Sequence, residues 1–230
     1  MDFSAMIPYA TYFQQGVIYT VLLSLCTVFF GLILALILAF MRMSKIKVLR
    51  FVSGAYIEFV RGTPMLVQLF LIFYVVFGSS GFTAPQFTLF GFIDGSRFVP
   101  GIIALSLNSG AYVAEIVRAG IQGVDYGQTE AAHSLGMTGM QNMRYIVLPQ
   151  AIRNILPAIA NEFVVIIKES SVCMVLGMQD IMYNVKLVQG ATFRVTEPLI
   201  IATLLYFCLT FPTSKLIQYF ERRMNRGYNR

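Results

Sequence analysis

Ionisable side chains interrupt the long apolar stretches of this sequence. Glu58 and Arg61 stand one helical turn apart in the second stretch. Glu115 lies in the third and Glu162 in the fourth. An ionised group at the centre of a membrane helix costs about 2.5–3.5 kcal/mol on insertion scales, so charges placed here need a function or a partner. An arginine fork binds a carboxylate bidentately. These charges are therefore candidates for a binding site within the membrane.

The second stretch is expected to break just after these charges. Gly62, Thr63 and Pro64 follow Arg61, and Pro64 has no N–H to donate to the carbonyl of Val60. Broken helices with freed backbone groups are typical of transporter binding sites. From the rise per residue, Arg61, Glu115 and Asn161 fall roughly 10–20 Å from the cytoplasmic edge, in one layer. The candidate binding residues are Glu58, Arg61, Gly62, Thr63, Asn108, Tyr112, Glu115, Asn161 and Glu162.

Structural explanations compete with binding at several of these positions. Glu58 and Arg61 can neutralise each other as an i, i+3 pair. For Glu115 and Arg118 we favour the structural pair, near the inner interface. A further polar group lies at the end of the fourth stretch and forms either an outer gate or a helix end; it consists of Lys168, Glu169, Ser170 and Ser171.

Composition indicates that the solvent of this chain is lipid. Of its 230 residues, 57% are hydrophobic and 12% are charged, with a mean hydropathy of +0.70. A soluble domain carries about 25% charged residues. The net charge of +6 sits in short segments between apolar runs, without a basic helix interleaved with aromatics, which argues against nucleic-acid binding. The three cysteines show no spacing typical of a metal site or a disulfide.

Five stretches are long enough to cross a bilayer as helices, which takes about 20 residues each. The sequence therefore predicts an all-α integral membrane protein of one domain, residues 1–230. The N-terminus lacks the basic start of a secretory signal, so the first stretch is expected to stay as a span. Three shorter segments are expected at the outer surface: Met6–Phe13, Gly78–Pro100 and a short helix at Asp180–Phe193. The five spans are Val17–Met41, Phe51–Phe77, Val99–Gly120, Pro149–Lys168 and Pro198–Leu216.

The distribution of Lys and Arg predicts the orientation, since cytoplasmic loops carry the excess of positive charge. Thirteen of the 17 basic residues fall on one side; they are Arg42, Lys45, Lys47, Arg50, Arg61, Arg118, Arg144, Arg153, Lys215, Arg222, Arg223, Arg226 and Arg230. The other side keeps Arg97, Lys168, Lys186 and Arg194. The N-terminus is therefore predicted outside and the C-terminus in the cytoplasm.

The loop after the third span, residues 121–148, has a distinct pattern. Residues from Thr129 favour a helix start, with Glu130 near the positive end of the helix dipole. Gly136 permits a sharp turn at positive φ. A second short helix is expected over Met137–Tyr145, with adaptable methionines on one face, and Pro149 suits the start of the fourth span. On its own, this pattern also describes a plain amphipathic hairpin on the membrane surface.

The complete spacing EAA-x3-G-x9-I-x-LP, from Glu130 to Pro149, resembles the signature of permease subunits of ATP-binding-cassette importers. EFVRGTPMLVQL, SLNSGAYVAEIVRAGI and NEFVVIIKESS are similar to the polar amino acid uptake branch of that family. The resemblance implies the type I importer permease fold. It also implies that the loop couples to a cytoplasmic ATPase through Glu130, Ala131, Ala132, Gly136, Met137, Met140 and Arg144.

The resemblance further implies a set of partners in a bacterial cytoplasmic membrane. They are a second permease subunit, identical or different, a dimer of ATPases, and an external amino-acid-binding protein. The sequence has no GxxxxGK[ST] run, so ATP and Mg²⁺ are expected to be used by the ATPase, and this chain is expected to be neither an enzyme nor a cofactor carrier.

Two other readings stay open. An autonomous ion-coupled transporter or channel would use the same intramembrane charges, but such folds usually carry inverted repeats, and none is evident. A membrane enzyme would need a nucleophile–base pair or a metal set. The single histidine, His133, has no partner of that kind in the sequence.

Overall fold

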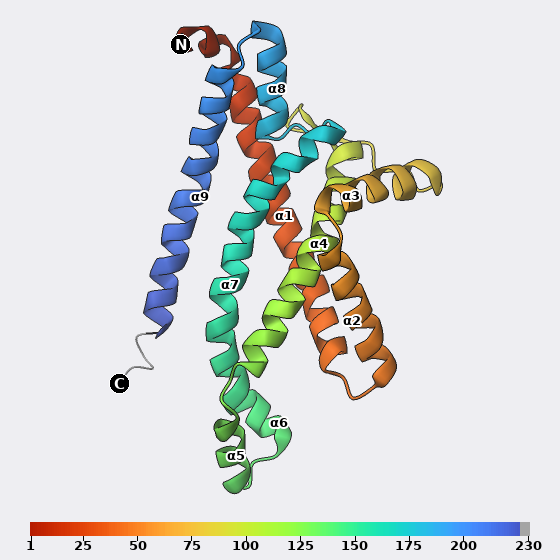
Figure 1. The fold of residues 1–230 in the computed structure, drawn as a ribbon, viewed down its shortest axis with the longest axis vertical. Coiled ribbons are helices and arrows are strands. Elements are labelled where there is room, and N and C mark those ends of the chain that lie inside the picture. The colour runs from red at the N-terminus through yellow and green to blue at the C-terminus, as the bar shows by residue number, and fades with distance from the viewer. Residues whose placement is uncertain (226–230) are drawn as a thin grey trace.

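The computed structural model describes residues 1–225, so the predicted cytoplasmic residues Arg226 and Arg230 lie outside the described part. Nearly all of the described chain is helical; its N-terminus lies at one end of the long axis, and its last helix runs from that end towards the other (Figure 1). The helices are α1 (Ala10–Met43), α2 (Lys47–Gly62), α3 (Met65–Phe70), α4 (Gly95–Gln122), α5 (Tyr126–Ser134), α6 (Gly139–Asn142), α7 (Leu148–Glu169), α8 (Ile181–Thr192) and α9 (Thr196–Asn225). Short 3-10 segments span Phe3–Tyr9 and Ser170–Leu176, π-helical segments span Leu71–Ser79 and Met143–Val147, and a small hairpin joins β1 (Thr88–Leu89) to β2 (Ile93–Asp94).

Helix α1 is the central support, because it contributes to all three clusters of buried side chains. At one end, Phe13 of α1 packs with α8 and α9. In the middle, Tyr19 and Leu23 pack with α3 and α4. At the other end, Leu38 packs with α2, α4 and α7. The chain therefore wraps its other spans around one long helix (Figure 1).

Small residues let α1 and α4 approach closely. A Cβ added to Gly31 of α1 would lie 3.3 Å from the Cβ of Ser109 on α4. A Cβ added to Gly110 of α4 would lie 2.8 Å from Cδ2 of Leu34 on α1. Helix association in lipid depends on such packing, since lipid tails are as apolar as the side chains.

Each predicted span corresponds to a helix or to a bent helix pair. Within the described chain, three helical stretches are long and apolar enough to cross a membrane: Phe3–Met43, Gly95–Gln122 and Thr196–Met224. The pair Lys47–Gly62 and Met65–Ser79, bent by 108°, makes a fourth. Helix α7 is not among them, but its 22 residues reach about 33 Å at the rise of an α-helix, and it lies beside the spans (Figure 1).

The surface segments differ in part from the sequence expectation. The helix expected at Asp180–Phe193 is confirmed as α8. The stretch Met6–Phe13 continues directly into α1, and its first and last side chains are buried against α8 and α9. The expected loop Gly78–Pro100 ends early, because α4 begins at Gly95, where Asp94 caps it by accepting from the Ser96 N–H at 2.9 Å.

Asp180 joins α8 to α9 at the end that carries the N-terminus. Its side chain is fully buried, and it caps α8 by accepting from the Tyr183 N–H at 2.9 Å. The Tyr206 hydroxyl of α9 donates to the same carboxyl at 3.3 Å. Burial raises the pKa of Asp180 from 3.8 to about 7, and these hydrogen bonds counteract only part of that rise.

The raised pKa predicts a pH-dependent stability. Between pH 4 and pH 7 folded Asp180 holds a proton that the unfolded chain has lost, so the free energy of unfolding falls as pH rises and levels off above pH 7. Each unit between the two pKa values corresponds to about 1.4 kcal/mol. We expect the thermal midpoint in detergent to fall over this range in the natural chain and to stay flat in Asp180→Asn.

Asp2→Asn serves as the control, because hydrogen bonds from Ser4 hold the pKa of Asp2 below its ordinary value, outside this pH window. An Asp180→Asn variant with the same pH profile as the natural chain would contradict the assignment.

Candidate functional site

The second span breaks at Pro64, as the sequence predicts. Helix α2 ends at Gly62, Thr63 and Pro64 are extended, and α3 starts at Met65 in a new direction. The carbonyl of Val60 loses its i+4 donor because that donor would be the proline nitrogen. It instead accepts from the Gln68 side-chain amide at 2.7 Å and from the Thr63 N–H at 3.4 Å.

Gln68 holds the two sides of the break together. Its Nε2 lies 2.7 Å from the Val60 carbonyl, 3.0 Å from the Thr63 carbonyl and 2.8 Å from the Thr63 hydroxyl. Its Oε1 accepts from the Asn108 amide of α4 at 3.1 Å. The sequence analysis missed this residue. The signal was a single glutamine in MLVQLF, four residues after the proline, where its side chain can reach back to the freed carbonyl.

Arg61 does not pair with Glu58, so the i, i+3 pairing considered from the sequence is wrong. The Arg61 guanidinium lies over the Tyr112 ring of α4, 5.4 Å from its centroid, in a cation–π contact. Glu58 points to the other side, where its carboxylate lies 4.0 Å from the Arg42 guanidinium and its side chain is 80% exposed. No ion pair of the described chain involves Arg61.

Glu115 and Arg118 form the structural pair favoured from the sequence. Arg118 donates to both carboxylate oxygens of Glu115, from Nε at 3.0 Å and from Nη2. Arg61 and Arg42 lie within electrostatic range of the same carboxylate. Charged groups of α1, α2 and α4 therefore lie near one another, while the layer that would also include Asn161 of α7 stays a prediction.

The polar residues of α7 make few contacts with the polar residues of α2 and α4. Asn161 is exposed, and no hydrogen bond of the described chain joins it to the α2–α4 group. Glu162 is partly buried beside Ser109 of α4. Glu169 is the last residue of α7, and the hydroxyl of Ser170 donates to the Ile167 carbonyl at 2.9 Å. Helix α7 therefore ends at Glu169 and a 3-10 segment follows from Ser170, while a role of Lys168, Glu169 and Ser170 as an outer gate stays a prediction.

The α5–α6 hairpin projects from the end of the molecule opposite the N-terminus (Figure 1). Helix α5 begins at Tyr126 with Asp125 as its cap, three residues before the predicted start, because the Asp125 side chain accepts from the Gly127 N–H at 2.7 Å. Gly136 turns the chain at φ +78°, as predicted. The second helix begins at Gly139, not at Met137, because Thr138 and Gln141 form a capping box there.

The hairpin is internally fixed and presents apolar side chains. The amide of Asn142 on α6 donates to the Thr129 hydroxyl on α5 at 3.2 Å, and Ala132 is buried between them. Leu135 and Met140 are 83% and 78% exposed. A small rigid element with exposed apolar residues is suited to docking on another protein.

The chain is similar to known transport proteins over nearly its whole length. The family model described as binding-protein-dependent transport system inner membrane component matches residues 27–226. The arginine transport system permease protein ArtQ of Bacillus subtilis is 38% identical over 225 residues, which cover 97% of each chain. The putative glutamine transport system permease protein GlnP of Rickettsia conorii is 37% identical over 217 residues, 94% of each chain.

Solved structures of transporters contain chains with the same fold. The crystal structure of an amino acid ABC transporter with histidines contains a chain that is 46% identical, with a TM-score of 0.88 over 97% of this chain and 99% of that one. A chain of the MetNI methionine ABC transporter in an inward-facing conformation shares the fold, with a TM-score of 0.72 at 18% identity over 95% of this chain and 99% of that one.

The family model and the relatives, which match nearly the whole chain, define its class: a transmembrane subunit of a binding-protein-dependent transport system. The chain belongs to the family of binding-protein-dependent transport system inner membrane components. It is thus a permease component of the bacterial inner membrane, and ATP hydrolysis is carried out by a partner ATPase.

Replacing Gln68 tests the break. Gln68→Leu leaves the Val60 and Thr63 carbonyls without their side-chain donor, and an unsatisfied buried group costs about 1–3 kcal/mol. We expect the thermal midpoint in detergent to drop by roughly 2–4 °C for each kcal/mol lost. Gln14→Leu, on an exposed part of α1, is the matched control and should leave the midpoint unchanged. A Gln68→Leu variant as stable as the control would exclude the bracing role.

Proposed function

We propose that this chain forms part of a path by which a polar amino acid crosses the membrane, with Arg61 as the contact for the cargo carboxylate. The observation that carries the proposal is the environment of Arg61. It lies next to the break in the second span, packs on an aromatic ring, and forms no ion pair within the described residues. A guanidinium held in this way is positioned to bind a carboxylate with two hydrogen bonds.

The cargo ammonium then needs an acceptor at the same level. Glu115 is engaged by Arg118, and Glu58 faces Arg42. Glu162 on α7 lies beside Ser109 and has no ion-pair partner in the described chain, which makes it the best-placed anion. Thr63, Asn108 and the backbone of Gly62 supply hydrogen-bonding groups near the break, and Asn161 supplies one from α7.

Exposed polar groups at this level also support a second permease subunit. Glu58, Arg61 and Asn161 are exposed in the single chain, and Tyr112 is 39% exposed. Such groups within spans are expensive in lipid and usually face a protein interior or a water-filled cavity. A second permease subunit, identical or related, would enclose this face and complete the path.

The remaining partners follow from the family's mode of operation. An external amino-acid-binding protein delivers the cargo, and a pair of ATPases binds ATP and Mg²⁺ on the cytoplasmic side. The relatives named for arginine and glutamine transport support this choice of cargo class. We propose that residues 1–230 act as one unit, with the N-terminus outside and the loop 121–148 in the cytoplasm.

Coupling is proposed to run through the α5–α6 hairpin. Glu130, Ala131 and Ala132 lie on α5, Gly136 forms the elbow, and Met137, Met140 and Arg144 follow it. When the ATPases close on ATP, the hairpin moves with them and α7, which continues from Met143–Val147, transmits the motion to the path. Hydrolysis then resets the path to face inward, which is alternating access.

Arg61→Ala tests the cargo contact. Loss of a charge-assisted bidentate bond, worth about 1.5–3 kcal/mol, should raise the half-saturating concentration for uptake of tritium-labelled L-arginine or L-glutamine roughly 10- to 100-fold. The assay uses proteoliposomes that contain the permease, the ATPase and the binding protein. Arg50→Ala, on the exposed face of α2, is the matched control. Unchanged uptake by Arg61→Ala would remove the carboxylate assignment.

Gly136 tests the coupling. A β-branched residue at φ +78° is strained, whereas asparagine tolerates the left-handed region. We expect Gly136→Val to insert in the membrane normally but to lose the ATPase in pull-downs and to abolish uptake, while Gly136→Asn retains both in part. Uptake driven by an ion gradient without any ATPase would instead establish an autonomous transporter.

A further inference from the structure

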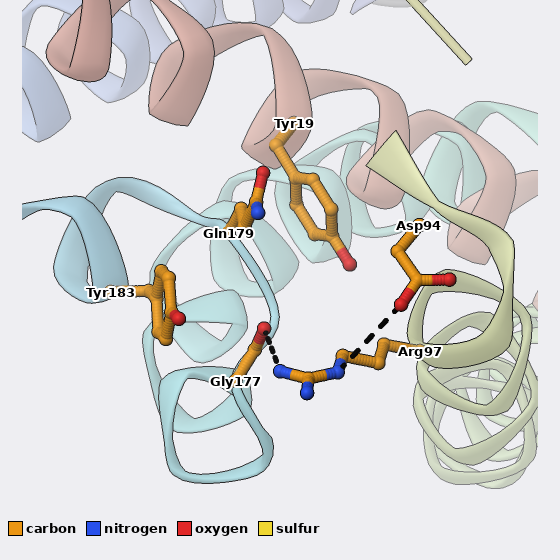
Figure 2. Close-up of a pocket in the computed structure, with 6 residues that line it drawn as sticks. All are labelled: Tyr19, Asp94, Arg97, Gly177, Gln179 and Tyr183. Carbon is orange, nitrogen blue, oxygen red and sulfur yellow. Dashed lines mark hydrogen bonds and ion pairs between the residues drawn. The ribbon is translucent and has the colours of Figure 1, made fainter. Parts of the chain in front are cut away.

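A polar cavity lies far from the α5–α6 hairpin, at the end of the molecule that carries α8. Its volume is about 240 Å³. Four separate segments enclose it: α1, the start of α4, the turn after Leu176, and α8. No step of the transport cycle proposed above uses it. Its lining residues, drawn in Figure 2, are Tyr19, Asp94, Arg97, Gly177, Gln179 and Tyr183.

One cation and one anion are fixed on the cavity wall. Arg97 Nη1 donates to the Gly177 carbonyl at 2.9 Å, and Arg97 Nε lies 3.8 Å from the carboxylate of Asp94. Asp94 also accepts from the N–H and the hydroxyl of Ser96, at 2.9 and 2.8 Å. The second terminal nitrogen of Arg97, Nη2, makes no hydrogen bond or ion pair within the described chain. The pair is therefore oriented yet keeps a free donor.

The backbone makes room for this arginine. Gly177 has φ +72°, and a Cβ added there would lie only 1.9 Å from Arg97 Nη1. Any other residue at this position would therefore strike the guanidinium as well as strain the backbone. The place of Arg97 beside the cavity depends on glycine at 177.

Tyr19 supplies the observation that points to a ligand. The residue is 1% exposed, and its hydroxyl has no hydrogen-bond partner among the described residues. In Figure 2 the hydroxyl points into the cavity, toward Asp94 and Arg97. The ring packs edge-on against Phe98 at 5.1 Å between centroids, a contact that phenylalanine would make equally well. A buried hydroxyl left without a partner is costly, so a molecule in the cavity is expected to satisfy it.

We propose that this cavity is a site for the head group of a free α-amino acid, occupied before the cargo enters the membrane path. Arg97 Nη2 and the Tyr19 hydroxyl donate to the carboxylate, and Asp94 and the Gln179 amide oxygen accept from the ammonium. The fixed charges of the wall sum to zero, which matches a zwitterion and not a simple anion or cation. This site rests on the proposed cargo class and on the outward placement of α8.

The test is equilibrium binding of tritium-labelled L-arginine to the permease–ATPase complex in lipid nanodiscs. We expect a component that survives Arg61→Ala and is displaced by glycine, which carries little more than the head group. Arginine without its carboxylate should not displace it. Tyr19→Phe and Arg97→Gln should each weaken this component at least 10-fold.

Thermal unfolding separates a ligand role from a structural one. Tyr19→Phe removes a hydroxyl that bonds to nothing in the described protein, so its thermal midpoint without amino acid should equal or exceed that of the natural chain. Tyr12→Phe, on the same helix and 43% exposed, is the matched control and should keep full binding.

The same experiments distinguish failure of the head-group site from failure of the proposed amino-acid transport. If the natural complex neither binds nor takes up L-arginine or L-glutamine, the cargo class fails, and this site fails with it. If uptake is normal but no binding survives Arg61→Ala, or if Tyr19→Phe and Arg97→Gln bind as the natural chain does, this site alone is overturned. Loss of binding-protein docking in these variants, with no amino acid bound, would make the cavity a protein contact and overturn it too.

Discussion

The need to satisfy every backbone polar group in lipid governs this structure. Proline at position 64 leaves the Val60 carbonyl without its helical donor in the middle of a span. The core of a bilayer contains no water that could donate a hydrogen bond to this carbonyl. The Gln68 amide takes the place of the missing donor and at the same time binds Asn108 of α4. The break is thereby held as a fixed corner of 108° rather than a loose joint. The extended residues of the corner, and Arg61 just before it, are presented beside α4.

Helix α4 links the parts of the molecule along its length. Arg97 stands in its first turn at the cavity beside α8, Asn108 and Tyr112 at the broken span, and Arg118 near the turn that leads to α5. At 1.5 Å per residue, the 28 residues of α4 extend about 42 Å. The close contact with α1 at Gly31 and Gly110 keeps this helix in place. Under the coupling proposed above, a displacement of the hairpin reaches packed helices that also carry the polar groups.

Charge pairing divides the ionisable residues into two sets. Glu115 with Arg118, and Glu58 with Arg42, have partners inside the chain and need no other explanation. Arg61 and Glu162 have no ion-pair partner among the described residues, and this leaves them available for the proposed cargo contacts. Residues one turn apart on one helix can still contact different neighbours: Glu58 lies near Arg42 of α1, whereas Arg61 lies over Tyr112 of α4.

The sequence by itself determined the membrane character, the helical stretches, the break at Pro64 and the turn at Gly136. Each follows from local rules: apolar length, the missing N–H of proline, and the freedom of glycine at positive φ. Helix ends were less well predicted, because caps at Asp94, Asp125 and Thr138 moved them by a few residues. Only the tertiary structure decided the partners of Glu58 and Arg61, the bracing role of Gln68, and the cavity around Tyr19. The cavity, for example, brings together Tyr19 and Tyr183, which are distant in the sequence. Residue spacing along the chain does not indicate which distant side chains become neighbours in the fold.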